Sequence, residues 1–159
     1  MNYWLLKSEP STFSIDDLAQ APRKTTLWDG VRNFQARNML RDQIKKGDQA
    51  FFYHSGDDQP GITGIVRIVR SGYPDPTAFD PEHAHYDAPR KNGKGLRQDP
   101  QWYGVDVRLV RKFKRIITLD ELRLHQRGAL EGLLILRRGN RLSVTPVARK
   151  EWDYILNLE

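Results

Sequence analysis

Apolar side chains come in short runs along this sequence, and none of the runs approaches the roughly 18 residues of a membrane span. Residues 3–6, 49–53 and 62–69 are such runs, and over residues 103–109 apolar side chains alternate with polar ones or glycine. These lengths and this alternation are typical of β-strands. We therefore predict an α+β fold in which an antiparallel or mixed sheet curls into a barrel, with helices packed outside it.

Four segments carry the signals of helices. Ser14 is a candidate N-cap followed by acidic residues, and this short helix should end before Pro22. Over residues 33–46, apolar side chains repeat at helical spacing beside a row of basic ones. Thr118 should cap a third helix, and a final helix with one apolar face should begin near Ala148. Strands nevertheless outnumber long helices in the predicted fold.

Residues 71–101 are rich in proline, glycine and charge, and they cannot form one regular element. A surface loop of this length is more often functional or mobile than structural. Within it, residues 90–97 contain glycines and cations but lack the spacing of a phosphate-binding P-loop. We interpret that stretch as a flexible basic loop.

The charge balance favours an acidic partner. With 26 Lys and Arg against 20 Asp and Glu, the 159 residues carry a formal charge of +6 and a sequence pI near 9.7. Such a surface favours nucleic acid through phosphate contacts, although many basic proteins bind no polyanion. The length fits a single domain spanning residues 1–159.

Cysteine is absent, which excludes disulfides, thiolate nucleophiles and cysteine-based zinc sites. The N-terminal stretch lacks the pattern of a signal peptide. We therefore expect a cytoplasmic, monomeric protein that needs no cofactor and does not associate with membranes.

Enzymatic chemistry has little support in the sequence. Ser55 beside His54 is the one tempting pair, but neighbours on a strand point to opposite faces and do not hydrogen-bond to each other. A small enzyme acting on nucleotides or RNA, with His54, Asp29 or Asp106 as its base, stays open as an alternative. So does a module whose basic face binds a protein or an RNA backbone without reading a base.

Residues 80–87 gather two histidines and three carboxylates, and His83 and His85 could give two nitrogens to a metal ion. The stretch lies in the proline-rich segment, where no rigid element is expected to fix ligand geometry. Solvated polar side chains are therefore the favoured interpretation, and we expect no metal dependence.

Aromatic residues beside polar or basic ones mark candidate contacts to a nucleobase. Trp28 lies in a predicted turn just before the basic helix, Tyr53 ends a strand, and Trp102 opens another. Stacking of a base on such a side chain contributes about 1–3 kcal/mol in single-strand binders. Each aromatic could equally belong to the core, but Trp28 is the favoured platform. Its truncation is expected to cost binding more than folding.

Seven motifs resemble, in order, the signature of EVE-domain proteins. They are residues 3–10 (YWLLKSEP), 28–38 (WDGVRNFQARN), 52–55 (FYHS), 61–66 (GITGIV), 73–80 (YPDPTAFD), 105–108 (VDVR) and 139–147 (GNRLSVTPV). The resemblance covers nearly the whole chain, which looks like a stand-alone bacterial member of the family. It implies a PUA-like curved β-barrel, mixed but mostly antiparallel, with flanking helices. The basic insert at residues 88–98 departs from the family pattern.

The resemblance also implies three residues of the site, and the strand-end positions of Tyr53, Ser55 and Trp102 add others to it. Trp28 matches a cage tryptophan of the related YTH domains, and Lys7 and Ser8 match their first-strand contacts. The predicted base pocket consists of Ser8, Trp28, Asn33, Tyr53, His54, Ser55 and Trp102, and the predicted phosphate or rim contacts are Lys7, Arg32, Arg37, Arg41 and Arg141. Asn33 could instead only cap its helix, and Arg37 and Arg41 could form a solvated face.

The predicted function is that of a non-enzymatic reader of nucleic acid. A base read in a pocket must leave its stack, so the partner is single-stranded or the base is flipped, which is least costly at a modified or unpaired site. By analogy with the family, the favoured ligand is a modified cytosine in DNA or RNA.

Overall fold

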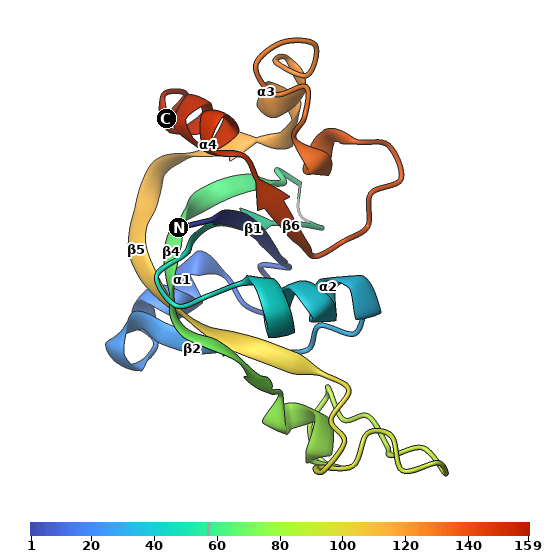
Figure 1. Cartoon of the computed structure of the whole chain (residues 1–159). Helices are drawn as coiled ribbons and strands as arrows, with labels where there is room; N and C mark the ends of the chain where they lie inside the picture. The colour runs from blue at the N-terminus through green and yellow to red at the C-terminus, as the bar shows by residue number, and fades with distance from the viewer. Residues whose placement is uncertain (57) are drawn as a thin grey trace.

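A computed structural model describes residues 1–56 and 58–159 and shows one six-stranded sheet (Figure 1). The strand order is β2-β5-β4-β3-β1-β6, and the strands are β1 Tyr3–Ser8, β2 Thr25–Trp28, β3 Gln49–His54, β4 Gly61–Pro74, β5 Tyr103–Thr118 and β6 Val144–Val147. Within the described chain, β1 and β3 pair in parallel and the other pairs are antiparallel. The predicted α+β class with a mixed, mostly antiparallel sheet is confirmed.

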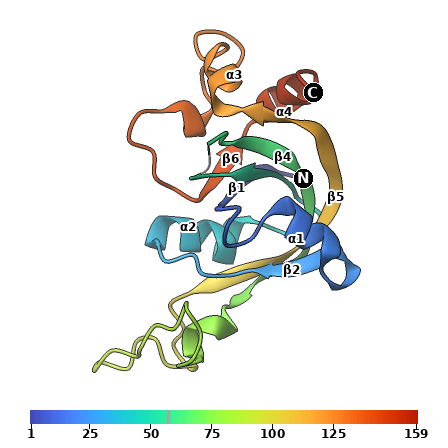
Figure 2. The same cartoon turned by 180° about the vertical axis from the view of Figure 1, so that it is seen from behind.

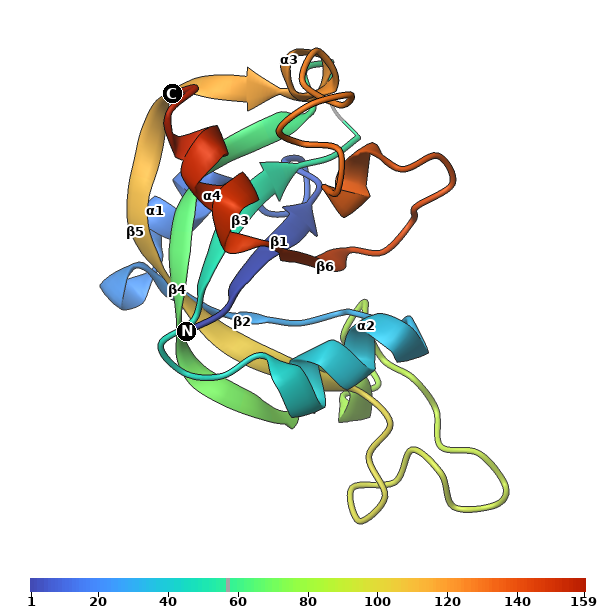
Figure 3. The same ribbon diagram turned by 45° about the horizontal axis from the view of Figure 1, so that its top comes forward.

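The two longest strands, β4 and β5, give the sheet its curvature (Figure 3). Their pairing register shifts at four places, and such irregularities bend a strand and increase its twist. At Gly64 an added Cβ would collide with the Ile15 side chain and the Arg111 carbonyl, so glycine permits this close approach. The predicted barrel is therefore a strongly curved, open sheet whose edges are β2 and β6.

The described α-helices are α1 Ile15–Gln20, α2 Phe34–Asn38, α3 Leu119–Arg123 and α4 Arg149–Leu156. Ser14 and Thr118 cap α1 and α3 through their side-chain oxygens, as predicted. The helix expected over residues 33–46 is shorter: α2 passes into a π-helical turn, η2 Met39–Gln43, in which the Ile44 N–H bonds to the Met39 carbonyl. Of the helices in the described part of the chain, none has the length and apolar character to span a bilayer.

The sheet separates two clusters of buried side chains, because successive residues of a strand point to opposite faces. Helices α1 and α2 lie on one side of the sheet, and α3 and α4 lie on the other (Figures 1 and 2). Phe52 packs on the face covered by α1 and α2, together with Trp28 from β2. Phe51 and Tyr53 pack on the other face, against α3 and α4. Trp28 and Tyr53 therefore belong to opposite sides of the sheet.

Two strands lie in segments for which the sequence predicts none. β2 and β6 have four residues each and form the edges of the sheet, so they carry little periodic signal. Two other strands are longer than expected. β5 continues to Thr118, and β4 reaches Pro74, after which the 3₁₀ turn η3 Pro76–Phe79 follows. The irregular part of the proline-rich segment thus begins only at residue 80.

Candidate functional site

A cavity of about 680 Å³, here called the main cavity, opens beside the carboxyl end of β2. Its walls come from segments far apart in the sequence: Lys7, Ser8, Glu9, Thr12, Phe13, Thr26, Leu27, Trp28, Asp29, Gly30, Val31, Arg32, His83, Ala84, His85 and Ser143. This volume falls within the range of about 300–1,000 Å³ that is typical of small-ligand sites.

Trp28 is both a wall of the main cavity and part of the core. It ends β2, is 7% exposed, and its ring meets Phe52 edge to face with 5.3 Å between centroids. Truncation to alanine is therefore expected to cost about 3–5 kcal/mol of folding stability. The expectation that truncation costs binding more than folding does not fit this burial.

Lys7 and Ser8, at the end of β1, line the main cavity together with Trp28. Burial lowers the pKa of the Lys7 ammonium group, because desolvation disfavours its charge. The Ser8 hydroxyl donates to the Phe13 carbonyl at 2.6 Å, so its oxygen lone pairs remain for a ligand. The structure thus brings these three predicted site residues together.

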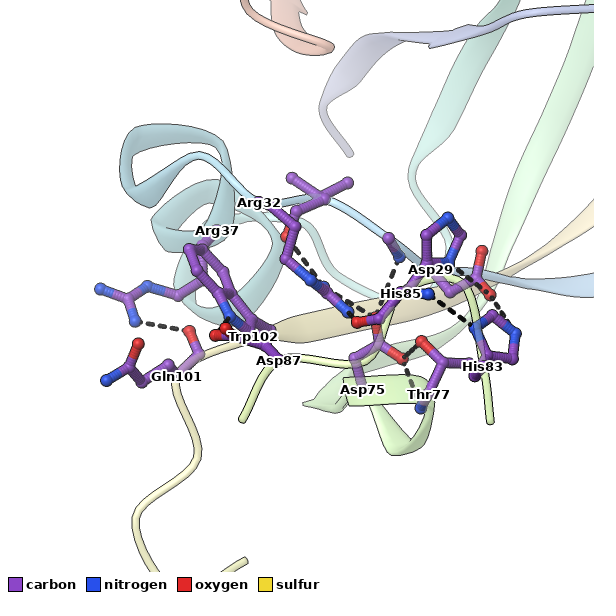
Figure 4. Close-up of polar contacts among 12 residues, drawn as sticks. Asp29, Arg32, Arg37, Asp75, Thr77, His83, His85, Asp87, Gln101 and Trp102 are labelled. Carbon is purple, nitrogen blue, oxygen red and sulfur yellow. Dashed lines mark hydrogen bonds and ion pairs between the residues drawn. The ribbon is translucent and has the colours of Figure 1, made fainter. Parts of the chain in front are cut away.

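A buried carboxylate fixes the turn after β2 (Figure 4). Asp75 is fully buried and accepts the Gly30 N–H at 3.0 Å, Arg32 Nη1 at 3.1 Å, and the N–H and hydroxyl of Thr77 at 2.9 and 2.6 Å. Burial by itself raises the pKa of this carboxyl, but the hydrogen bonds from Thr77, Gly30 and Arg32 outweigh it and hold the pKa below its usual value. Asp75 therefore anchors the turn as a charged group.

Arg32 connects the same turn to the loop after η3. Its Nη2 donates to the His85 carbonyl at 2.7 Å, while Nη1 pairs with Asp75. The His85 ring packs against Gly30, where an added Cβ would lie 2.5 Å from ring carbon Cε1. Gly30 also has a φ of 76°, which glycine adopts without steric cost. Arg32, predicted as a phosphate or rim contact, lines the cavity but has its charge matched by Asp75.

Two histidines assigned by the sequence to a solvated loop line the main cavity instead. His83 Nε2 lies 4.0 Å and His85 Nδ1 3.4 Å from Asp29 Oδ2, and the three side chains are 32–35% exposed. The expectation that nothing fixes the geometry of this stretch is wrong, because Arg32 and Asp75 hold the loop against the turn after β2, while the side chains keep the expected contact with solvent.

Tyr53 and Ser55 line a different cavity of about 610 Å³, whose walls include residues from α3 and from the 3₁₀ turn η4 Leu134–Leu136. Lys7 lines both this cavity and the main one. Tyr53 is buried, and burial raises its pKa to about 12. The structure does not bring Tyr53 and Ser55 to Trp28, because they belong to the other side of the sheet.

His54 and Asn33 have partners within the fold. His54 Nε2 accepts the Ile15 N–H at 3.1 Å, at the first turn of α1. Asn33 Oδ1 accepts the Ala36 N–H at 2.9 Å and caps α2. Neither is among the described residues that line the main cavity, so the capping alternative holds for Asn33.

Trp102 lies in a neighbouring hollow of about 330 Å³, which shares Arg32 and His85 with the main cavity. The indole Nε1 donates to Asp87 Oδ2 at 2.6 Å, and the ring stacks on Phe34 with 4.9 Å between centroids. The Arg32 guanidinium lies 5.4 Å from the Trp102 ring. Trp102 is therefore adjacent to the main cavity but is not a wall of it.

The other predicted rim residues do not line the main cavity. Arg37 donates to the Gln101 carbonyl at 2.7 Å and so holds the chain before β5. Arg41 pairs with Asp42 at 2.8 Å, and Arg141 is exposed. Arg41 and Arg141 remain predicted phosphate contacts, whereas Arg37 has an internal bond to break before it can bind a phosphate.

Of the three residues considered as an enzymatic base, Asp29 alone lines the main cavity in the described chain. Asp106 accepts the Tyr73 hydroxyl at 2.5 Å, and burial together with this bond raises the pKa of Tyr73. His54 is occupied by the N–H of Ile15. The enzyme alternative thus depends on Asp29.

Several cavity residues carry no local sequence signal. Thr12, Phe13 and Thr26 are ordinary loop or strand residues in the sequence, and they reach the cavity through tertiary contacts. The signals that could have found others are the family motifs, which contain Asp29 and Ser143, and the spacing of the histidines in residues 83–85.

A curved, open mixed sheet flanked by helices, with a cavity walled by a tryptophan at the end of an edge strand, defines a PUA-like domain. The chain belongs to the EVE domain family, whose model matches residues 2–158.

Relatives come from bacteria and eukaryotes. Mouse thymocyte nuclear protein 1 is 46% identical over 173 residues, covering 99% of this chain and 74% of that protein. A crystal structure of a Pseudomonas putida protein matches with a TM-score of 0.88 and 47% identity, covering 98% of each chain. Human THYN1 in complex with DNA containing 5-methylcytosine matches with a TM-score of 0.88 and 41% identity, covering 99% of this chain and 97% of that one. This spread does not support the expectation of a bacterial source.

Proposed function

We propose that this chain binds nucleic acid and reads a modified base of the cytosine type in the main cavity, without catalysing a reaction on it. The observation that carries the proposal is a cavity walled by Trp28 in a chain of the same family as human THYN1, a protein crystallised with DNA containing 5-methylcytosine.

The cavity offers the groups that such a ligand needs. A base enters it only from a single strand or after flipping, and the exposed part of the Trp28 indole can then contact its face. The Ser8 oxygen can accept from an exocyclic amino group. Lys7 can meet a phosphate, and an anion beside it would oppose the lowering of the Lys7 pKa by burial.

A pair of matched tryptophan variants tests the proposal. Trp28→Phe keeps an aromatic ring in the core but reduces the stacking surface, so affinity for a single strand containing 5-methylcytosine should fall by about 3- to 10-fold. Trp152→Phe is the control, because Trp152 is also buried and its ring stacks on Phe51, with 3.9 Å between centroids, on the other side of the sheet. Its affinity should match that of the parent in fluorescence anisotropy titrations.

Two outcomes would count against the proposal. Equal losses in both variants would mean that the core, not the cavity, controls binding. Turnover of the oligonucleotide above a blank, abolished by Asp29→Asn, would favour the enzyme alternative instead.

A further inference from the structure

Asp29, His83 and His85 bring three metal-ligand atoms together on the wall of the main cavity (Figure 4). Among the residues that the structure describes, one oxygen or nitrogen from each of these side chains lies within 4.8 Å of the others. We propose that this group binds a divalent transition-metal ion such as Zn²⁺, which reverses the expectation drawn from the proline-rich sequence.

The distances from the two histidine nitrogens to the Asp29 carboxylate approach those of a bound site. Two bonds of about 2.0–2.1 Å that meet at a tetrahedral angle separate their ligand atoms by about 3.4 Å. The distance from His85 Nδ1 to Asp29 Oδ2 is 3.4 Å. His83 Nε2 is 4.0 Å from the same oxygen, so its ring must move inward by roughly half an ångström on binding.

The segments that supply the ligands are already held in place. Asp75 fixes the N–H of Gly30, the residue after Asp29, and Arg32 fixes the carbonyl of His85. The His85 ring also rests on Gly30. Hydrogen bonds outside the ligand set orient the ligands and raise the affinity for metal. The loop therefore has the rigidity that its sequence does not reveal.

His85 supplies a buried nitrogen in need of a partner. Its Nδ1 has no hydrogen-bond partner among the described residues, although Asp29 Oδ2 is 3.4 Å away. Buried polar atoms without a partner are rare because they are costly, and a metal ion would satisfy this one.

His83 has to give up a hydrogen bond to join the site. Its Nδ1 accepts the His85 N–H at 3.0 Å, which places the ring proton on Nε2. Coordination through Nε2 moves that proton to Nδ1, so the bond from His85 must open. His83 is therefore expected to be the weakest of the three ligands.

Two imidazoles and one carboxylate suit Zn²⁺, Ni²⁺, Cu²⁺ or Fe²⁺ better than Mg²⁺ or Ca²⁺, which prefer oxygen ligands. Three protein ligands leave at least one coordination position open. Because all three side chains line the main cavity, that position is accessible to water or to an oxygen or nitrogen of a bound nucleic acid. Metal binding itself needs no nucleic acid, so it does not depend on the proposed function.

Titration of Zn²⁺ into tag-free protein by isothermal calorimetry tests the site. We expect one Zn²⁺ per chain, with binding at least about tenfold weaker in His85→Gln and in Asp29→Asn. Glu82→Gln is the matched control, because Glu82 is exposed in the same loop and lies outside the ligand group. It should bind Zn²⁺ like the parent.

A further variant keeps the test valid if one of these fails to fold. His83→Gln removes the most exposed ligand, and circular dichroism melts establish that each variant is folded. Absence of Zn²⁺ binding by the parent up to about 1 mM would overturn the proposal. So would Zn²⁺ binding that every folded ligand variant retains unchanged, since the ion would then bind elsewhere on the protein.

Discussion

The two halves of the proline-rich segment differ in how they are held. In residues 75–87, Asp75 is buried and bonded to the turn after β2, and Arg32 holds the His85 carbonyl. Residues 88–101 project from the body as a loop (Figures 2 and 3). Between residues 88 and 99 the backbone bonds are short-range, from the Arg90 N–H to the Lys94 carbonyl and from the Gly95 N–H to the Asp99 carbonyl. Arg37 holds the Gln101 carbonyl where the chain returns to β5.

The content of proline, glycine and charged residues therefore does not tell a segment that lines the main cavity from an ordinary surface loop. Both halves are polar and broken by proline, yet in the described chain only the first contributes residues to the main cavity. The deciding feature is Asp75, because a buried charge is tolerated only where hydrogen bonds compensate it. Asp75 thus fixes both the turn after β2, through Gly30 and Arg32, and the start of η3, through Thr77.

The largest effect is expected from removing this anchor. Asp75→Ala leaves Arg32 and the Gly30 N–H without their acceptor and should lower the free energy of unfolding by about 3–5 kcal/mol in urea melts. Asp80→Ala, at an exposed position whose carboxylate accepts the Glu82 N–H, should cost at most about 1 kcal/mol. Similar losses of stability in Asp75→Ala and Asp80→Ala would show that Asp75 is not the anchor that distinguishes residues 75–87 from residues 88–101.

A smaller effect of Asp75 on stability should appear at acidic pH. The folded-state pKa of Asp75 is held below its usual value, so its contribution to stability is fully present above the unfolded-state pKa of about 3.9 and is lost as pH falls through the folded-state pKa. Urea melts from pH 6 down to about 2.5 should show a loss of stability for the parent that is less steep for Asp75→Asn. Because Asp75 is buried, the difference should persist in about 0.5 M salt; its disappearance there would assign it to surface charges.

The smallest effect on folding is expected from substitutions in residues 88–101, the half of the segment that projects from the body. Lys91 and Lys94 are exposed in the basic insert, and replacing both by Gln should change stability by no more than about 0.5 kcal/mol. If the loop meets phosphates, binding of all sequences should weaken alike, and the slope of log affinity against log salt should fall by up to about 2. Lys150→Gln, on the exposed side of α4, serves as the control and should leave the slope unchanged. A selective loss for one sequence would instead place the two lysines near the base.

Much of the fold could be predicted from neighbouring residues. The predictions of β5 from its alternation and of the N-caps at Ser14 and Thr118 are confirmed, because these features depend on side chains a few positions apart. The edge strands β2 and β6 escaped prediction because four residues carry too little periodicity, and their pairing with β5 and β1 supplies the order.

The site was predicted only in part. Lys7, Ser8 and Trp28 lie together in the main cavity, as the family motifs implied, whereas Tyr53 and Ser55 face a second cavity. The reason is the two-residue period of a strand, which sends Tyr53 to the side opposite Phe52 and thus away from Trp28.

The sequence by itself determined the class of fold, the family and the end of β1 as part of the candidate site, because these follow from local periodicity and from ordered motifs. Only the tertiary structure decided that His83 and His85 face Asp29 across about fifty residues of chain. The approach of these histidines to Asp29 depends on Asp75, which is buried and fully hydrogen-bonded only once η3 packs against the turn after β2. No pattern of neighbouring residues therefore encodes this approach.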